Sequence, residues 1–381
     1  MKKRNSWTLG ALALAAIVAL GACSNEAATQ GGNSAPANGT VNVYNWADYI
    51  GETTLADFTA ATGIKVNYDL FDSNEMLQGK LTAGNTGYDV VVPGSMFAKK
   101  QIEAGFYQKW DKAQLPNLSH LDPAIVAKLK EVDPGNEYLI PWGWSFSTVA
   151  VNHSKLEPVL KKHGLTMPAN TWELLFNPVY TSKVKECGIT LLDSPSEVFP
   201  ALMHFMGQNP YNTDTAVHQQ AAEQLGKVRP DIRVFSEGAT LIDAFAAGNF
   251  CVAHMWAGDA NTAIGRHQEA KGTDRMEVTL PSTGGLMFID TVALLKDAKN
   301  VTQAHQFMNF TMDPKNSVQI TAASGYLQGN AGAQALLDES IRTNKTINLR
   351  PEDVQKLVPP APISDATSES FSTLFTKVKG Q

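Results

Sequence analysis

Short apolar runs alternate with helical segments between residues 41 and 94, and this alternation restricts the chain to a small set of folds. The runs are rich in β-branched and aromatic residues, which favour strands. The segments between them place apolar side chains at helical spacing. The predicted strands are residues 41–46, 64–71 and 88–94, and the predicted helices are residues 53–62 and 74–83. This order is typical of an α/β fold with an open sheet whose ligand lies at the carboxyl ends of its strands.

The rest of the chain continues the α/β pattern and is too long for one hydrophobic core. Strands are predicted within residues 147–152, 188–195, 250–256 and 277–296, and helices over about 196–207, 214–228, 301–312, 330–342 and 366–379. About 340 residues follow the N-terminal segment, so we expect two lobes with a cleft between them. Lobe 1 is predicted to comprise residues 40–146 plus about 279–315, and lobe 2 residues 147–278 plus about 316–381.

The N-terminus reads as an export signal. Lys2, Lys3 and Arg4 precede an apolar stretch, residues 9–20, which is too short to span a bilayer. The sequence Leu-Gly-Ala-Cys that follows resembles the bacterial lipobox, which predicts a cleaved signal over residues 1–22 and a lipid anchor on Cys23. The alternative is a soluble exported protein with an incidental cysteine. Small polar residues then predict a flexible tether over residues 23–39.

The net charge indicates the kind of ligand, and the cysteine content indicates a disulfide. The formal net charge is −6, and loss of the three cations in the leader makes it about −9, which disfavours nucleic acid and favours a cationic ligand. Cys187 and Cys251 remain in an exported chain, where paired thiols usually form a disulfide, so one bridge is predicted. The alternative is two separate buried thiols. The pattern predicts no metal site and no cofactor.

Aromatic residues and carboxylates recur together at the ends of predicted strands. The three clusters are Trp46-Ala47-Asp48-Tyr49, Trp256 with Asp259, and Phe288 with Asp290. A buried alkylammonium needs carboxylates in place of water and gains about 0.5–2 kcal/mol from each aromatic face. Together the clusters predict a box for a diamine or triamine, although any single ring taken alone is more typical of a core. Asp89 is expected to bind backbone groups, and Asp69 and Asp72 to face solvent.

Several longer motifs resemble the periplasmic polyamine-binding receptors of bacterial ABC importers. They are YNWADYI, TGIKVNYDLFDSNE, GYDVVVPG, LLDSPSEVF, HMWAGD and MFID, and the resemblance runs from about Val41 to at least Tyr326. It implies a two-lobe type II periplasmic binding protein fold with a ligand cleft between the lobes. It also implies an aromatic box of Trp46, Tyr49, Trp256, Phe288 and Tyr326, and amine-binding carboxylates at Asp48, Glu197, Asp259 and Asp290.

The resemblance further implies that Cys187 and Cys251 are bonded. Two positions depart from the pattern of putrescine receptors. Ala47 and Gly94 stand where hydroxyl-bearing residues are usual, and Ser95 beside Gly94 could partly substitute. The choice among putrescine, cadaverine, spermidine and an agmatine-like guanidine therefore stays open.

The expected function is capture of a polyamine, with putrescine first and spermidine next, and its delivery to an ABC importer. The protein is expected to be a periplasmic, lipid-anchored monomer and not an enzyme. Two other functions remain open. A polyamine-sensing receptor that signals through a membrane partner would have the same pocket. A hydrolase would use two of the acids as general acid and base, but no nucleophile or oxyanion donor set is evident in the sequence.

Overall fold

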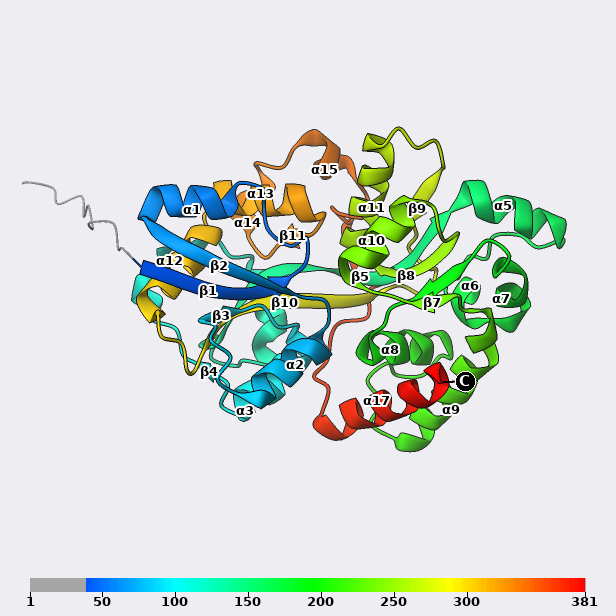
Figure 1. Ribbon diagram of the computed structural model, residues 1–381, viewed down its shortest axis with the longest axis horizontal. Coiled ribbons are helices and arrows are strands. Elements are labelled where there is room, and N and C mark those ends of the chain that lie inside the picture. Colours follow the sequence, from blue (N-terminus) through cyan, green and yellow to red (C-terminus); the bar gives the residue numbers. More distant parts are fainter. Residues whose placement is uncertain (1–38, 381) are drawn as a thin grey trace, which may run out of the picture. The chain divides into compact units, whose positions relative to one another are not determined.

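A single mixed sheet forms the centre of the protein. The structure is a computed structural model that describes residues 39–380 (Figure 1). The main strand order is β2-β1-β3-β10-β5-β8-β6-β7, while β4 pairs with β10, and β9 and β11 pair with β5. The strands are β1 (Gly39–Trp46), β2 (Ile64–Phe71), β3 (Val90–Val91), β4 (Tyr107–Gln108), β5 (Leu139–Asn152), β6 (Ile189–Leu191), β7 (Val234–Phe235), β8 (Val252–Trp256), β9 (Met276–Val278), β10 (Leu286–Leu295) and β11 (Leu327–Gln328).

Two parallel groups of strands flank an antiparallel centre. Strand β1 pairs in parallel with β2 and β3, and β6 pairs in parallel with β7 and β8. Between these groups, β5 and β10 run antiparallel to each other, and every residue of both strands is buried. Strands buried on both faces read as continuous apolar runs, as these two largely do. Because β5 and β10 lie between the two parallel groups, residues on them can contact both halves of the molecule.

Helices cover the sheet on both faces (Figure 1). They are α1 (Thr54–Thr62), α2 (Asn74–Ala83), α3 (Ser95–Glu103), α4 (Pro123–Lys128), α5 (His153–Lys162), α6 (Glu173–Phe176), α7 (Pro178–Val184), α8 (Pro195–Phe205), α9 (Thr215–Val228), α10 (Gly238–Ala246), α11 (Ala257–Glu269), α12 (Val301–Thr311), α13 (Pro314–Ser324), α14 (Ala331–Gln334), α15 (Glu339–Thr343), α16 (Pro351–Val354) and α17 (Asp365–Lys379). Local capping begins many of them: the side chain of Ser73 caps α2 and that of Asp214 caps α9.

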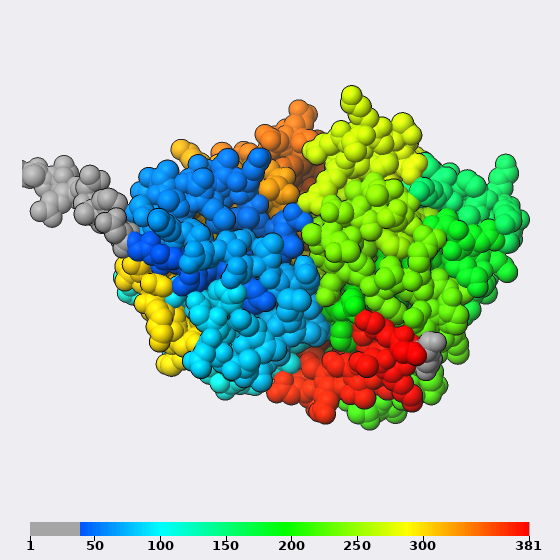
Figure 2. All heavy atoms as spheres, viewed as in Figure 1, coloured from blue at the N-terminus to red at the C-terminus, as the bar shows by residue number. Residues whose placement is uncertain are grey.

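The hydrophobic core extends across both parallel groups of strands. Its largest fully buried side chains include Phe58 on α1, Phe146 on β5 and Phe199 on α8. Burying one such side chain stabilises a fold by roughly 1.5–3 kcal/mol. A smaller cluster around Tyr44 and Leu77 packs α2 against the outer strands. Figure 2 shows atoms of the N-terminal segments directly against those of α10 and α11, so the two halves are in contact at this surface.

The predicted disulfide is confirmed. Cys187 and Cys251 are bonded, and they are separated by 64 positions in the sequence. Cys187 lies just before β6 and Cys251 just before β8, and these two strands pair in parallel. The bond therefore joins two neighbouring strands at the ends where they begin.

Most predicted elements are present, although several differ in extent, as three examples show. Strand β3 comprises only Val90–Val91, ending before Pro93, which has no amide hydrogen to donate. Strand β5 begins at Leu139, well before the predicted residue 147. The helix predicted over 330–342 is instead two short helices, α14 and α15.

Three regions of the sequence predictions cannot be compared directly with these elements. The predicted signal peptide, the anchor Cys23 and the tether up to residue 38 lie outside the described residues, and β1 already includes Gly39.

Within residues 39–380, no helix is long and apolar enough to cross a membrane. Because β5 and β10 run between both halves, the strand order does not fix the lobe boundaries, which stay a prediction.

Candidate functional site

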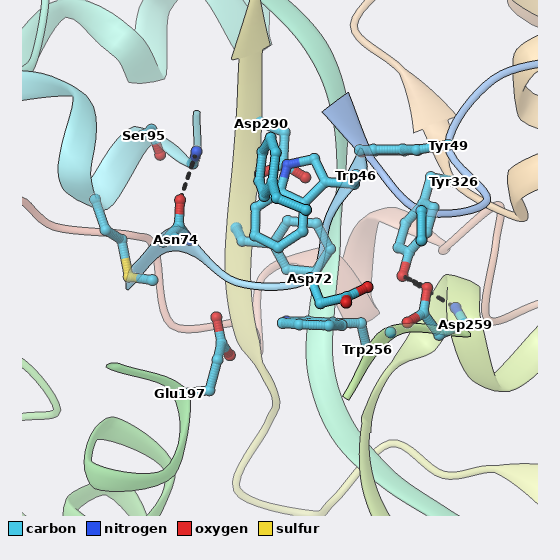
Figure 3. Close-up of a pocket in the computed structure, with 16 residues that line it drawn as sticks. Trp46, Tyr49, Asp72, Asn74, Ser95, Glu197, Trp256, Asp259, Asp290 and Tyr326 are labelled. Carbon is cyan, nitrogen blue, oxygen red and sulfur yellow. Dashed lines mark hydrogen bonds between the residues drawn. The ribbon is translucent and has the colours of Figure 1, made fainter. Parts of the chain in front are cut away.

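A pocket lies where the carboxyl ends of both parallel groups of strands meet (Figure 3). Its walls are built mainly from residues at or just after the carboxyl ends of β1, β2, β3 and β8 and from the first turns of α8 and α10. The side chains that complete it come from β10 and from Tyr326, which lies between α13 and β11. The structure brings ten of the eleven predicted ligand-binding residues to this pocket: Trp46, Tyr49, Gly94, Ser95, Glu197, Trp256, Asp259, Phe288, Asp290 and Tyr326.

Aromatic rings from both halves form the walls. The rings of Trp46 and Trp256 meet edge to face, with centroids 5.8 Å apart. The indole N–H of Trp46 donates a hydrogen bond to the carbonyl oxygen of Val92 at 2.9 Å, which fixes the ring relative to the neighbouring strand. Tyr326 contacts Phe288 and Tyr49 edge to face, with centroids 5.8 Å and 4.9 Å apart. The pocket therefore has preformed π-faces on several sides.

Three carboxylates are buried among these rings. Glu197, Asp259 and Asp290 are only 5%, 9% and 6% exposed. Burial raises the pKa of the Glu197 and Asp259 carboxyls to about 7, and it raises the pKa of Asp290 well above its ordinary value. The described residues that line the pocket include no Lys and no Arg. The site thus holds three acids whose charged forms are poorly compensated by the protein itself.

Asp259 is held by Tyr326. The Tyr326 hydroxyl donates a hydrogen bond to Asp259 Oδ1 and accepts one from the Asp259 backbone N–H at 3.0 Å. The neighbouring Gly258 makes this approach possible, because a Cβ at that position would lie 2.3 Å from the Tyr326 ring. Figure 3 shows Asp259 and Tyr326 at one end of the pocket, with Glu197, Asn74 and Ser95 toward the other.

Asp48 is the one predicted ligand-binding residue that the structure does not bring to the pocket. It is exposed, and its Oδ1 lies 2.8 Å from the Arg266 guanidinium on α11. Arg266 also contacts Asp243 at 2.7 Å. The Asp48 carboxylate is therefore already paired with a cation, outside the aromatic walls. Its amine-binding role, which the resemblance implies, stays a prediction that this geometry does not favour.

Two polar residues that line the pocket were not among the predicted ligand-binding residues. Asp72 was expected to face solvent, and this is wrong, because it is half-buried and forms part of the pocket wall. Asn74 at the start of α2 lines the pocket as well. Both follow the carboxyl end of β2, and Trp46 lies at the carboxyl end of β1, so the same strand-end argument could have found them.

Gly238 on α10 also lines the pocket, and no sequence signal pointed to it. Among residues 39–380, no group of three or more His, Cys, Asp or Glu side chains could hold a metal ion.

Comparison with known proteins identifies the family. The model of the bacterial extracellular solute-binding protein family matches residues 53–348. The putrescine-binding periplasmic protein SpuD of Pseudomonas aeruginosa (strain UCBPP-PA14) is 40% identical over 100% of this chain and 99% of its own. The putrescine-binding periplasmic protein PotF of Escherichia coli (strain K12) is 37% identical over 89% of this chain and 91% of its own.

A solved structure supports the same assignment. A putative spermidine/putrescine ABC transporter protein from Listeria monocytogenes superposes with a TM-score of 0.79 at 27% identity, covering 89% of this chain and 98% of its own. The predicted two-lobe fold is confirmed by this neighbour, and the expected export agrees with the extracellular family and the periplasmic relatives. The chain belongs to the bacterial extracellular solute-binding protein family.

Proposed function

We propose that this protein binds a polyamine, with putrescine first and spermidine next, in the pocket and delivers it to an ABC importer. One observation carries the proposal: three carboxylates are buried among aromatic rings, and the described pocket lining contains no Lys or Arg. An unpaired buried charge is strongly unfavourable, so the site calls for cations from outside the chain.

The arrangement of rings and acids matches the two ends of a linear diamine. Glu197 lies toward one end of the pocket and Asp259 toward the other, with Trp46 and Trp256 between them (Figure 3). Ammonium groups would pair with the acids, and the methylene chain would pack on the rings. Putrescine comes first because SpuD and PotF are both named as putrescine-binding proteins. Spermidine follows because the similar Listeria protein is described as a spermidine/putrescine transporter.

Contacts between the two sides of the pocket give ligand capture a mechanism. Besides the ion pair between Asp48 and Arg266, Asp72 packs so closely on Gly238 that a Cβ there would lie 2.2 Å from Asp72 Oδ1. Such contacts form only when the sides approach each other. A ligand that bridges both walls favours this closed form over an open one, because its contacts are complete only there. The closed form is then the one presented to the membrane permease.

The proposal also includes a lipid anchor on Cys23 and a ligand that the protein leaves chemically unchanged. After export, Cys23 would be acylated and would tether the protein to a bacterial membrane. Metabolic labelling with a radioactive fatty acid should mark the wild-type protein and not a Cys23→Ala variant. The ligand should be recovered chemically unchanged after incubation, which mass spectrometry can check. A converted product would favour an enzyme instead.

Calorimetric titration of the purified protein with a panel of linear amines tests the central claim. Putrescine, cadaverine, spermidine and agmatine should be compared with the neutral diol 1,4-butanediol, which matches putrescine in chain length. We expect one molecule of diamine per chain and no measurable binding of the diol. Equal binding of the diol, or no binding of any amine, would contradict the proposal, because the acids then do not select a cation.

A further inference from the structure

Asn74 and Gly94 contact each other in the pocket wall. Asn74 is the first residue of α2 and is 6% exposed. Its Oδ1 accepts a hydrogen bond from the backbone N–H of Gly94 at 2.9 Å. Gly94 caps the start of α3 and also forms a backbone bridge with Asp290, one of the buried acids. The glycine therefore connects the Asn74 amide with the strand that carries an acid of the pocket.

The backbone at position 94 does not require glycine. Its φ of −67° and ψ of 139° are ordinary extended values that any residue can adopt. The requirement comes instead from Asn74. A Cβ at position 94 would lie 2.8 Å from Asn74 Nδ2 and 2.9 Å from Asn74 Oδ1, which is closer than carbon atoms approach such groups. Any side chain at position 94 must therefore displace the Asn74 amide.

We propose that Asn74 and Gly94 act as one specificity-determining unit, in which the missing side chain at position 94 lets the Asn74 amide reach the ligand. This inference rests on the proposed function and adds a ligand-contacting residue to it. The Gly94 N–H holds Oδ1 in place, and a carbonyl oxygen retains a second lone pair that can accept another hydrogen bond. Gly94 thus positions an acceptor in the wall, in the place that a side chain at position 94 would take.

The position of this acceptor favours one kind of cationic group at this end of the ligand. Figure 3 shows Asn74 and Ser95 on the same side of the pocket as Glu197. A primary ammonium has three N–H donors at tetrahedral angles, so it can bond a carboxylate and an amide oxygen together. A guanidinium is planar, and when two of its N–H groups bond a carboxylate in parallel, its remaining N–H groups point along that same plane and not toward an acceptor outside it. The pair should therefore favour a primary ammonium over a guanidinium at this end of the pocket.

A double-mutant cycle tests the unit. Calorimetry would give the dissociation constants of putrescine and agmatine for wild type, Gly94→Ala, Asn74→Ala and the double variant. We expect Gly94→Ala to weaken putrescine binding about tenfold in the wild-type background. In the Asn74→Ala background the same change should cost less than about twofold, because no amide remains to be displaced. Asn74→Ala should also lower the preference for putrescine over agmatine.

The control is Gly79→Ala on α2, where an added Cβ would meet no atom within 4 Å. It should leave both affinities unchanged, and thermal melting without ligand should show that all variants fold. If Gly94→Ala weakens binding equally in both backgrounds, or in neither, the two residues do not act together and the inference is overturned. The proposed function fails separately, if the wild-type protein itself binds no amine.

Discussion

The Glu75 carboxylate accepts a hydrogen bond from the backbone N–H of Ser196 at 3.2 Å, across 121 positions of sequence. Glu75 lies in the first turn of α2 and Ser196 in the first turn of α8, so the contact joins helices on opposite sides of the pocket. The Ser194 hydroxyl donates a second hydrogen bond to the same carboxylate, also at 3.2 Å. A carboxylate at a helix N-terminus is stabilised by the free N–H groups and the helix dipole.

Replacing Glu75 with Ala should weaken ligand binding without weakening the unliganded fold. The contact contributes only when the two sides meet, and hydrogen bonds to a charged group are worth about 1.5–3 kcal/mol. We therefore expect the dissociation constant for putrescine to rise about 10-fold or more in calorimetry. Glu103→Ala removes an exposed acid from the end of α3 and is the matched control. A similar loss in both variants would point to general electrostatics and not to this contact.

Asp259→Asn should cost more affinity than removal of an aromatic wall. The substitution leaves an ammonium without its counter-ion, and breaking a buried ion pair costs about 3–5 kcal/mol, which is a factor of hundreds or more in affinity. Trp46→Leu loses cation–π contact worth about 0.5–2 kcal/mol, or at most about 30-fold. Calorimetry with putrescine compares the two directly. Unchanged affinity in the Asp259→Asn variant would count against the assigned site.

Ligand should stabilise the protein more at pH 8 than at pH 5. Burial in the pocket raises the pKa of Glu197 and of Asp259 to about 7, against about 4 in an unfolded chain. Raised acid pKa values mean that the ligand-free folded form is most stable below pH 4 and loses stability as the pH rises to about 7. Bound ammonium groups favour the ionised acids and restore the loss. The ligand-induced rise in melting temperature should therefore be larger at pH 8 by at least about 3 °C.

The matched control for this pH effect is the Asp259→Asn variant, in which one of the titrating acids is gone. Its ligand-free melting temperature should depend less on pH over the same range. Identical pH profiles for the two proteins would exclude Asp259 as a source of the effect.

Removal of the disulfide should lower stability and leave binding intact. The bond closes a loop across 64 positions, and loss of such a bond typically costs about 2–5 kcal/mol. Neither Cys187 nor Cys251 lines the pocket. The Cys187→Ser, Cys251→Ser double variant should melt several degrees lower in the absence of ligand and bind putrescine with wild-type affinity below that temperature. A large loss of affinity in the folded variant would link the bond to the site.

Asp48→Asn separates the role implied by resemblance from the contact in the structure. Because Asp48 is exposed and pairs with Arg266, its loss should weaken putrescine binding by no more than about 10-fold, far less than the loss of Asp259. Arg266→Gln should have a similar effect, and the two changes should not add. Additive effects, or a loss as large as that of Asp259→Asn, would place Asp48 on the ligand.

The regular elements around the pocket were largely predictable, because local signals and burial agree there. The helices α1, α2, α9 and α17 carry apolar periodicity with clear ends, and the structure places them within one residue of the predicted bounds. Asp89 follows the same logic. It was expected to bind backbone groups, and it accepts hydrogen bonds from the N–H groups of Asn42, Lys299 and Asn300.

The first half of β5 could not be predicted, because its sequence carries turn signals. Pro141 and Gly143 lie inside this strand, where such residues usually end one. The structure tolerates them where the pairing of β5 with β10 shifts register, between Ile289 and Thr291. Such an irregularity depends on the partner strand, which is more than 140 residues away in the sequence.

The pocket residues could also be predicted only where the local sequence indicates their role. Acids and rings at strand ends were predictable as a group, since their types match one ligand chemistry. Asp72 was not predicted, because the residues before it have the pattern of an exposed strand and Gly238, which packs against it, lies far along the chain. Asp48 shows the opposite case. Its motif predicts a ligand-binding role, but in the structure it pairs with Arg266, which lies 218 positions away. Pairings of this length are set by the fold and have no local signature.

Phe288 and Asp290 lie on β10, at the centre of the sheet, and not on either outer group of strands. The floor of the pocket is therefore part of the central sheet, which in the proposed opening would stay in place while the walls move apart. When the walls separate, the ligand would lose its contacts with Trp256 and Asp259 while keeping its contact with Phe288. On the proposed function, release would then take place in two steps, and the rate of transfer to a permease would depend on how strongly the floor alone holds the ligand.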